Sequence, residues 1–185
     1  RKIGSPGVAY GNEIMVGDDN QNPVATNEEG EILVRGSNVM QGYLDRPEET
    51  AKTITANAWL RTGDLGRMDE DGFIFVTGRI KELIIKGGEN IAPREIDEAL
   101  LEHEAVLEAA AFPRACKDYG QRVEACVCLK KGRHVSENEL REFCEGLIGA
   151  YKTPDNIYFL DDLPKGPSGK VQRMKLIDLT QSVNT

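Results

Sequence analysis

The residues whose types and spacing suit chemistry lie mainly in one stretch, residues 59–93, and in one loop, residues 163–170. In the first stretch Asp64 follows a glycine, where the backbone can turn sharply and present the carboxylate outward. An ionised carboxylate only accepts hydrogen bonds, and its two oxygens can each take one hydrogen from a vicinal diol such as ribose. The alternative is an Asx-type turn that closes a hairpin, and the run R-T-G-D taken alone favours that structural interpretation.

Two cations follow where the chain leaves an expected strand. Residues 73–76 are aromatic and β-branched and are bounded by turn residues, which predicts a buried strand ending at Gly78. Arg79 and Lys81 come directly after this strand. For each cation, a solvated basic residue at a strand end is the alternative interpretation.

Two glycine-containing loops could present or admit ligand groups. Gly87 and Gly88 interrupt a second expected strand at residues 83–85, and adjacent glycines are tolerated where a ligand or another backbone approaches closely. In residues 163–170, two prolines and two glycines exclude regular structure and are expected to hold Lys170 at the tip of a defined turn. Each loop in isolation is also explained as an ordinary turn, with Lys170 as a solvated side chain.

Periodic patterns predict α+β elements around these residues. Strands are expected at residues 13–16, 30–36, 106–112, 123–129 and 157–160, and helices are expected to begin at Pro47 and Pro93. Ser136 and Glu139 form a capping box for a third helix. An unbroken apolar stripe on that helix is predicted to be core, and it consists of Leu140, Phe143, Cys144, Leu147, Ile148 and Tyr151.

Composition narrows the classes of function. The chain has 185 residues with 39% hydrophobic and 29% charged residues, enough for one or two compact units. Its net charge of −8 and the absence of a basic cluster argue against nucleic acid or an anionic membrane surface as partner. No apolar run approaches the ~18 residues of a membrane span. The four cysteines lack metal-ligand spacing, so we expect no metal site, reduced thiols and a cytoplasmic location.

Several motifs carry a resemblance to a known family. The run T-G-D is followed by G-R-x-K-E-L-I and by G-G-x-N-I-x-P-x-E-I. G-E-I-L-V-R-G and G-Y-x-x-R-P-E-x-T precede this series, and L-P-K-x-x-S-G-K-V comes after it. In this order, and over nearly the whole chain, the motifs resemble the adenylate-forming superfamily of acyl-CoA synthetases, peptide-synthetase adenylation domains and luciferases.

The resemblance implies a domain organisation. Residues 1–78 correspond to a small β-barrel that forms the last part of a large AMP-binding N-terminal domain, here incomplete. Residues 79–81 correspond to a hinge, and residues 82–185 to a compact α+β C-terminal domain. The family's phosphate loop and acyl pocket lie upstream of residue 1, so we expect the chain to be the C-terminal piece of a longer synthetase and to be inactive alone.

The resemblance also implies a two-step chemistry with ATP/AMP and CoA. A carboxylic acid reacts with Mg²⁺-ATP to give an acyl-adenylate, and the acyl group then passes to a thiol, usually that of CoA. Asp64 would hold the ribose hydroxyls, Arg79 would assist there, and Lys170 would be the adenylation lysine. Mg²⁺ would be bound mainly by the missing N-terminal part.

Rotation of the C-terminal domain between the half-reactions is the third implication. Lys81 matches the hinge position, and Gly78 before it makes a backbone change easy. After rotation, the loop of Gly87 and Gly88 would leave room for the pantetheine arm of CoA.

Three readings of the function remain open from the sequence. Lys81 followed by E-L-I favours a CoA ligase, whereas domains that load carrier proteins more often have Asp at that position. The alternatives are a carrier-protein-loading adenylation domain and a non-catalytic interaction or regulatory module. The short polar end at residues 180–185 suggests that no carrier module follows. The acid, which could be small, dicarboxylic, aryl or a medium fatty acid, and the oligomeric state stay undetermined.

Overall fold

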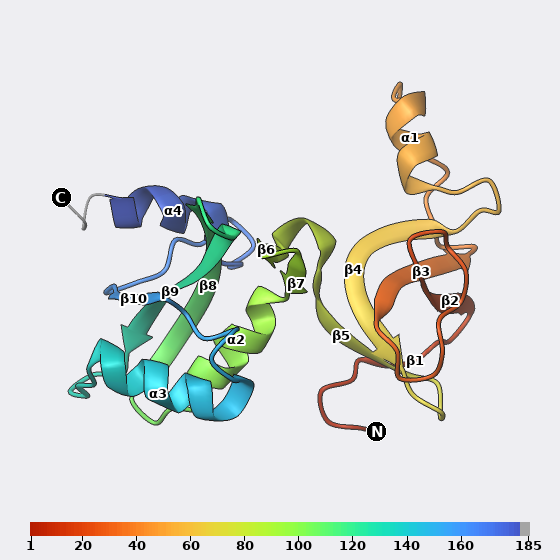
Figure 1. Cartoon of the computed structure of the whole chain (residues 1–185). Coiled ribbons are helices and arrows are strands. Elements are labelled where there is room, and N and C mark those ends of the chain that lie inside the picture. Colours follow the sequence, from red (N-terminus) through yellow and green to blue (C-terminus); the bar gives the residue numbers. More distant parts are fainter. Residues whose placement is uncertain (182–185) are drawn as a thin grey trace. The chain divides into compact units, whose positions relative to one another are not determined.

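The computed structural model describes residues 1–181 and contains two compact units (Figure 1). The N-terminal unit comprises Arg1–Lys81, and the C-terminal unit begins at Glu82. Each unit has its own sheet. Both units combine helix and strand, which confirms the predicted α+β class.

The N-terminal unit is built on an antiparallel sheet. Its elements are β1 (Gly7–Val8), β2 (Asn12–Gly17), β3 (Gly30–Gly36), α1 (Pro47–Thr53), β4 (Leu60–Met68) and β5 (Phe73–Arg79), followed by a 3₁₀ turn, η1 (Ile80–Glu82). The strand order is β1-β5-β4-β3-β2. This path is open among the described residues, so the expected β-barrel is here a five-stranded open sheet. The two outer strands are each paired on one side only.

The C-terminal unit is a mixed sheet with helices on both faces. Its elements are β6 (Ile84–Lys86), β7 (Glu89–Ile91), α2 (Pro93–Leu101), β8 (Val106–Cys116), β9 (Gly120–Leu129), α3 (Glu137–Ile148), β10 (Asn156–Phe159) and α4 (Arg173–Gln181). β9 lies at the centre, because it pairs antiparallel with β8 and β6 and parallel with β10. The parallel pair requires a crossover, and α3 forms part of it.

Alternation along β9 supplies two apolar cores. Val123, Ala125 and Val127 face a cluster that includes Ile96 of α2 and other side chains from α2 and α3. The intervening Cys126 and Cys128 face a second cluster on the other side of the sheet, which includes residues of α4. Cys126 and Cys128 therefore lie on one face of the strand, away from the first core. Figure 1 shows α4 on the opposite side of the sheet from α2 and α3.

The third helix and the chain end differ from expectation. α3 begins at the predicted cap, where the Glu139 N–H donates to Ser136 Oγ at 3.2 Å, but only Leu140 and Cys144 of the predicted stripe are fully buried. The helix ends at Ile148, so Tyr151 lies beyond it, and the side chain of Leu147 is 47% exposed. Residue 180, expected in a polar terminus, is a buried threonine of α4. Residues 182–185 of that expected terminus lie outside the described part.

Candidate functional site

Asp64 lies in a β-bulge of β4. Between the β3–β4 pairs Glu31↔Leu65 and Leu33↔Arg61, the chain advances two residues on β3 but four on β4. The two extra residues push the T-G-D segment out of the ladder, and Gly63 at φ +72° provides the left-handed backbone conformation there. A bulge often re-aims a side chain, and this one sets the direction of Asp64.

Side chains replace the ladder bonds that the bulge removes. Thr62 Oγ1 donates to the Ile32 carbonyl at 2.6 Å and accepts the Asp64 N–H at 3.0 Å. The Gly63 N–H donates to a carboxylate oxygen of Glu31 at 3.0 Å. These local bonds fix the backbone from Thr62 to Asp64, as buried backbone groups require partners.

Asp64 and Arg79 face each other on neighbouring strands. They form a register pair between β4 and β5, and Arg79 Nε lies 2.8 Å from Asp64 Oδ1. Their side chains are 30% and 54% exposed, respectively, so solvent or a ligand can reach both. The ion pair orients the carboxylate, and its other oxygen, Oδ2, remains suited to accept from a hydroxyl. The structure thus brings together the two residues to which the resemblance gave a role at the nucleotide.

Lys81 lies in the short turn η1, at the last position of the N-terminal unit. Its side chain is exposed. Gly78, expected to ease a hinge, is buried and paired with Leu65 inside β5. Within the described residues 1–181, the segment between β5 and β6 has helical geometry only in η1, Ile80–Glu82.

Gly87 and Gly88 form a two-residue hairpin loop between β6 and β7, whose ends are the pair Lys86↔Glu89. Their φ values of +57° and +89° match those of a type I′ turn, which needs positive φ at both central positions. A Cβ on Gly87 would lie 3.0 Å from the hydroxyl oxygen of Tyr151, whereas a Cβ on Gly88 would meet open space. The turn interpretation is therefore satisfied by geometry, and Gly88 is the more open of the two positions.

Lys170 lies on a narrow, hydrogen-bonded loop. An isolated bridge joins Lys165 and Val171, and the Gly166 N–H donates to the Lys170 carbonyl at 2.8 Å. Lys170 is therefore on the returning arm of the loop, and residues 167–168 form the tip, contrary to the expected placement of Lys170 there. Its side chain is exposed and makes no hydrogen bond or ion pair within the described chain.

Arg173, three residues after Lys170, anchors that loop to the body of the C-terminal unit. Its guanidinium contacts both carboxylate oxygens of Asp97, at 3.2 and 2.5 Å, and donates to the Ala111 carbonyl at 3.0 Å. It also pairs with Glu82 at 3.1 Å. Burial raises the pKa of Asp97 above its ordinary value, and the Arg173 guanidinium opposes this shift.

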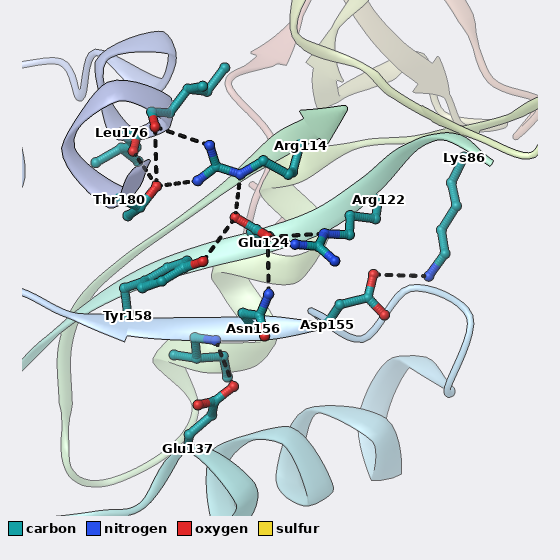
Figure 2. A network of polar contacts seen from close by, with 12 residues as sticks. Lys86, Arg114, Arg122, Glu124, Glu137, Asp155, Asn156, Tyr158, Leu176 and Thr180 are labelled. Carbon is teal, nitrogen blue, oxygen red and sulfur yellow. Dashed lines mark hydrogen bonds and ion pairs between the residues drawn. The ribbon is translucent and has the colours of Figure 1, made fainter. Parts of the chain in front are cut away.

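A second network ties the far end of α4 to the sheet (Figure 2). Glu124, fully buried on β9, lies 2.7 Å from Arg114 and 2.7 Å from Arg122. Arg114 also donates to the Ile177 carbonyl at 3.1 Å and to Thr180 Oγ1. The two arginine anchors thus hold both ends of α4, the helix that follows the lysine loop.

Sequence reasoning did not identify Glu31, Arg173 or Glu124. Each is a charged residue that acts through a partner distant in the sequence, and charge alone does not reveal burial. Glu31 and Glu124 do carry a weak signal, because each is an acid directly beside a run of apolar residues in its strand.

The described residues contain neither a metal-binding cluster nor a membrane-spanning helix. Residues 1–181 contain no group of three or more His, Cys, Asp or Glu side chains placed to hold a metal ion, so they do not fit a magnesium site. Burial raises the pKa of Cys126 to about 12 and that of Cys144 to about 11, which keeps both thiols protonated. Within the same residues, every helix is too short or too polar to cross a membrane.

Comparison with known proteins identifies the class of this fold. Residues 95–170 match the AMP-binding enzyme C-terminal domain family. The chain therefore carries this domain, and its relatives are CoA ligases of the adenylate-forming superfamily, as the resemblance of its motifs predicted.

The relatives also point to CoA ligases. The sulfoacetate–CoA ligase of Cupriavidus necator is 48% identical over 178 residues, which cover 96% of this chain and 35% of that protein. Among solved structures, ATP-bound MatB from Rhodopseudomonas palustris has a TM-score of 0.92 at 32% identity, covering 98% of this chain and 37% of that one. The o-succinylbenzoate CoA synthetase of Bacillus subtilis, in complex with its acyl-adenylate intermediate, has a TM-score of 0.86 at 39% identity, covering 95% and 36%. The chain thus spans about a third of the length of the curated relatives it matches.

Proposed function

We propose that this chain is the C-terminal part of an ATP-dependent acid–CoA ligase, which forms an acyl-adenylate and then an acyl-CoA thioester. The observation that carries the proposal is Lys170, an exposed ammonium without a partner in the described chain, on a loop anchored by Arg173. An exposed lysine alone would be ordinary, but this one lies in a chain 48% identical to a named CoA ligase.

The Asp64–Arg79 pair would bind the nucleotide. Asp64 would accept hydrogen bonds from the ribose hydroxyls, because an ionised carboxylate can only accept and a ribose diol offers two donors. Arg79 would hold the carboxylate in place through Nε and would present its remaining N–H groups to the ribose side of the nucleotide. The ATP-bound crystal structure of MatB supports nucleotide binding by a relative of this fold.

Lys170 would act in the first half-reaction. The attacking carboxylate and the α-phosphate both carry negative charge, and an ammonium positioned between them lowers the energy of the transition state. The bond formed joins the carboxylate oxygen to the α-phosphorus, and the bond broken releases pyrophosphate. A loop held by backbone bonds and by Arg173 favours this role, because such electrostatic stabilisation depends on a fixed position.

The second half-reaction would use the glycine turn. A thiolate attacks the acyl carbonyl and AMP leaves, so the lysine loop and the thiol path are needed at different times. We place the hinge at residues 79–81, with Lys81 as the hinge residue. It lies between an incomplete N-terminal domain (residues 1–78) and the C-terminal domain (residues 82–185). The open side of Gly88 would then leave room for the pantetheine arm of CoA.

The remaining parts of the catalyst are assigned to the rest of the parent protein. These are the triphosphate-binding loop, the acid pocket and the Mg²⁺ ligands, so we expect this chain alone to be inactive. CoA is favoured over a carrier protein as acceptor because Lys81 is followed by E-L-I and because named relatives are CoA ligases. A cytoplasmic location belongs to the same proposal.

The two half-reactions of the parent enzyme test the proposal. Lys170→Ala should slow adenylate formation by about 10²- to 10³-fold, because a preorganised charge is lost. Thioester formation from supplied acyl-adenylate should stay close to the wild-type rate. Both steps can be followed by rapid-quench assays.

Lys175→Ala is the matched control, since Lys175 is an exposed lysine five positions further on, in α4. It should leave both half-reactions unchanged. An equal loss in both steps for Lys170→Ala would mean that the lysine supports the fold rather than the adenylation chemistry, and the proposal would be withdrawn.

A further inference from the structure

A buried carboxylate lies behind the bulge that presents Asp64. The side chain of Glu31, on β3, is only 8% exposed. Its Oε1 accepts the Gly63 N–H at 3.0 Å, and its Oε2 accepts from Arg61 Nε at 2.8 Å. Both oxygens are therefore engaged by residues of β4 that flank Thr62. A buried acid directly before the apolar run Ile32–Val34 is unusual and requires such partners.

The bulge itself explains the need for this acid. The Gly63 N–H is turned out of the β3–β4 ladder, because the register skips from Leu33↔Arg61 to Glu31↔Leu65. A backbone N–H left without a partner in a partly buried position is unfavourable. Glu31 satisfies it, and Arg61 neutralises the charge that this places inside the sheet.

We propose that Glu31 is a positioning residue for nucleotide binding: by holding the Gly63 amide it fixes the bulge, and so the direction in which Asp64 presents its carboxylate to the ribose. This inference rests on the proposed function, because it needs Asp64 to contact the ribose hydroxyls. Glu31 touches neither substrate nor reacting atoms. Its effect reaches the ligand only through residues 63 and 64, which are adjacent in the chain.

Glu31→Gln removes this support with little change of shape. Both partners of the carboxylate are donors, whereas a carboxamide has a single oxygen and presents N–H donors on its other side. Either the Gly63 N–H or the Arg61 guanidinium must then face another donor. The bulge is expected to relax, and Asp64 should lose its alignment with the diol.

The readout is the preference of the full-length parent enzyme for ATP over 3′-deoxyATP, expressed as a ratio of kcat/KM values for adenylate formation. A ratio measured on one preparation is independent of the fraction of enzyme that is folded, so a merely structural role for Glu31 would not change it. The wild type should prefer ATP, and Glu31→Gln should reduce that preference by about 10-fold, which is typical of losing a hydrogen bond to a charged group.

Two variants serve as controls. Glu13→Gln makes the same substitution in an acid of β2 that pairs with Arg35 in the same sheet but is 62% exposed and contacts no residue of the bulge. It should keep the full preference. Asp64→Asn should lose the preference whether or not Glu31 is intact.

The outcomes separate the two proposals. If Asp64→Asn retains the preference for ATP, the proposed role of Asp64 fails, and the inference about Glu31 fails with it. If Asp64→Asn loses the preference but Glu31→Gln retains it, only the inference about Glu31 is overturned. Should Glu31→Gln not fold, Glu31→Asp keeps the charge but is too short to reach both partners, and an undiminished preference in that variant would also overturn the inference.

Discussion

Gly87 and Gly88 are required by the backbone turn itself, whether or not a ligand binds there, because both have positive φ. Positive φ at both positions is costly for residues with a Cβ, and Asn tolerates it better than branched or long side chains. The two positions differ in surroundings, because only Gly87 lies against Tyr151 and Tyr119. A substitution at Gly88 therefore tests the turn with less interference from neighbouring side chains.

We predict that Gly88→Leu destabilises the chain by about 1–2 kcal/mol, through strain at its positive φ, whereas Gly88→Asn costs less. Urea unfolding of the 185-residue chain measures both. In the parent enzyme, Gly88→Leu should also slow thioester formation from supplied acyl-adenylate while adenylate formation continues. Equal losses in both half-reactions would show that the glycine provides only the turn.

Asp64 illustrates what the sequence can reveal about a site residue. The residues around it alone favoured a structural turn, and its nucleotide role was implied only by the resemblance to adenylate-forming enzymes. The structure adds Arg79 as its ion-pair partner. The support from Glu31 could not be predicted, because it depends on a β3–β4 register that joins residues about thirty positions apart. Local patterns describe side-chain chemistry well and long-range contacts poorly.

At the scale of elements, the attachment of α4 to the sheet depends on a buried ion pair. Glu124 is fully buried and forms ion pairs with Arg114 and Arg122. Arg114 also donates a hydrogen bond to the Ile177 carbonyl, near the end of α4 (Figure 2). Breaking a buried ion pair by removing one partner is strongly destabilising, because it leaves an uncompensated charge. The helix that follows the lysine loop is thus sensitive to a residue on the central strand.

We predict that Glu124→Ala destabilises the C-terminal unit by about 3–5 kcal/mol. Loss of hydrogen-exchange protection in β9 and α4 would report the effect locally. Glu104→Ala, which removes an exposed acid paired with Arg133, is the matched control and should change protection little. Replacing Arg114 and Glu124 together by leucine should recover part of the loss, and no recovery would argue against the uncompensated charge as its cause.

The elements with clear local signals were predicted, and the exceptions have physical reasons. β3 has the predicted bounds, because two glycines flank an apolar run. β4 was not predicted, because its bulge interrupts alternation with a glycine and an aspartate. α4 was missed because only Leu176 and Thr180 are buried on it, which leaves little apolar periodicity. In α3 the predicted stripe continued past the end of the helix at Gly149, whose φ is +79°.

At the scale of the whole molecule, the two units have unequal cores. The buried hydrophobic side chains of the N-terminal unit are Val16, Ile32, Leu33 and Ile74. The C-terminal unit has two clusters, one on each face of its sheet. Burial of apolar surface is the main stabilising contribution in folding, so the C-terminal unit should resist local opening more strongly.

Limited proteolysis should therefore cut the chain near residues 20–30 or 78–82 before it cuts within residues 94–160. The expected product is a protected fragment that begins close to Glu82, identified by mass spectrometry. Urea at a concentration that unfolds both units is the control, because cleavage should then lose this preference. Early cleavage within residues 94–160 under native conditions would contradict the greater stability of the C-terminal unit.

The contacts of Arg173 have a mechanical consequence. This one side chain joins Glu82, at the start of the C-terminal unit, to Asp97 of α2 and to the end of the lysine loop. In a rotation about residues 79–81, as we propose, Glu82 would be the first residue of the moving part. A movement of Glu82 would be transmitted through the Arg173 guanidinium directly to the loop that carries Lys170. The intervening ninety or so residues would not have to change conformation first. The C-terminal unit would then rotate as a rigid body, and the contacts of Arg173 would keep the loop of Lys170 fixed to the end of the unit next to the hinge.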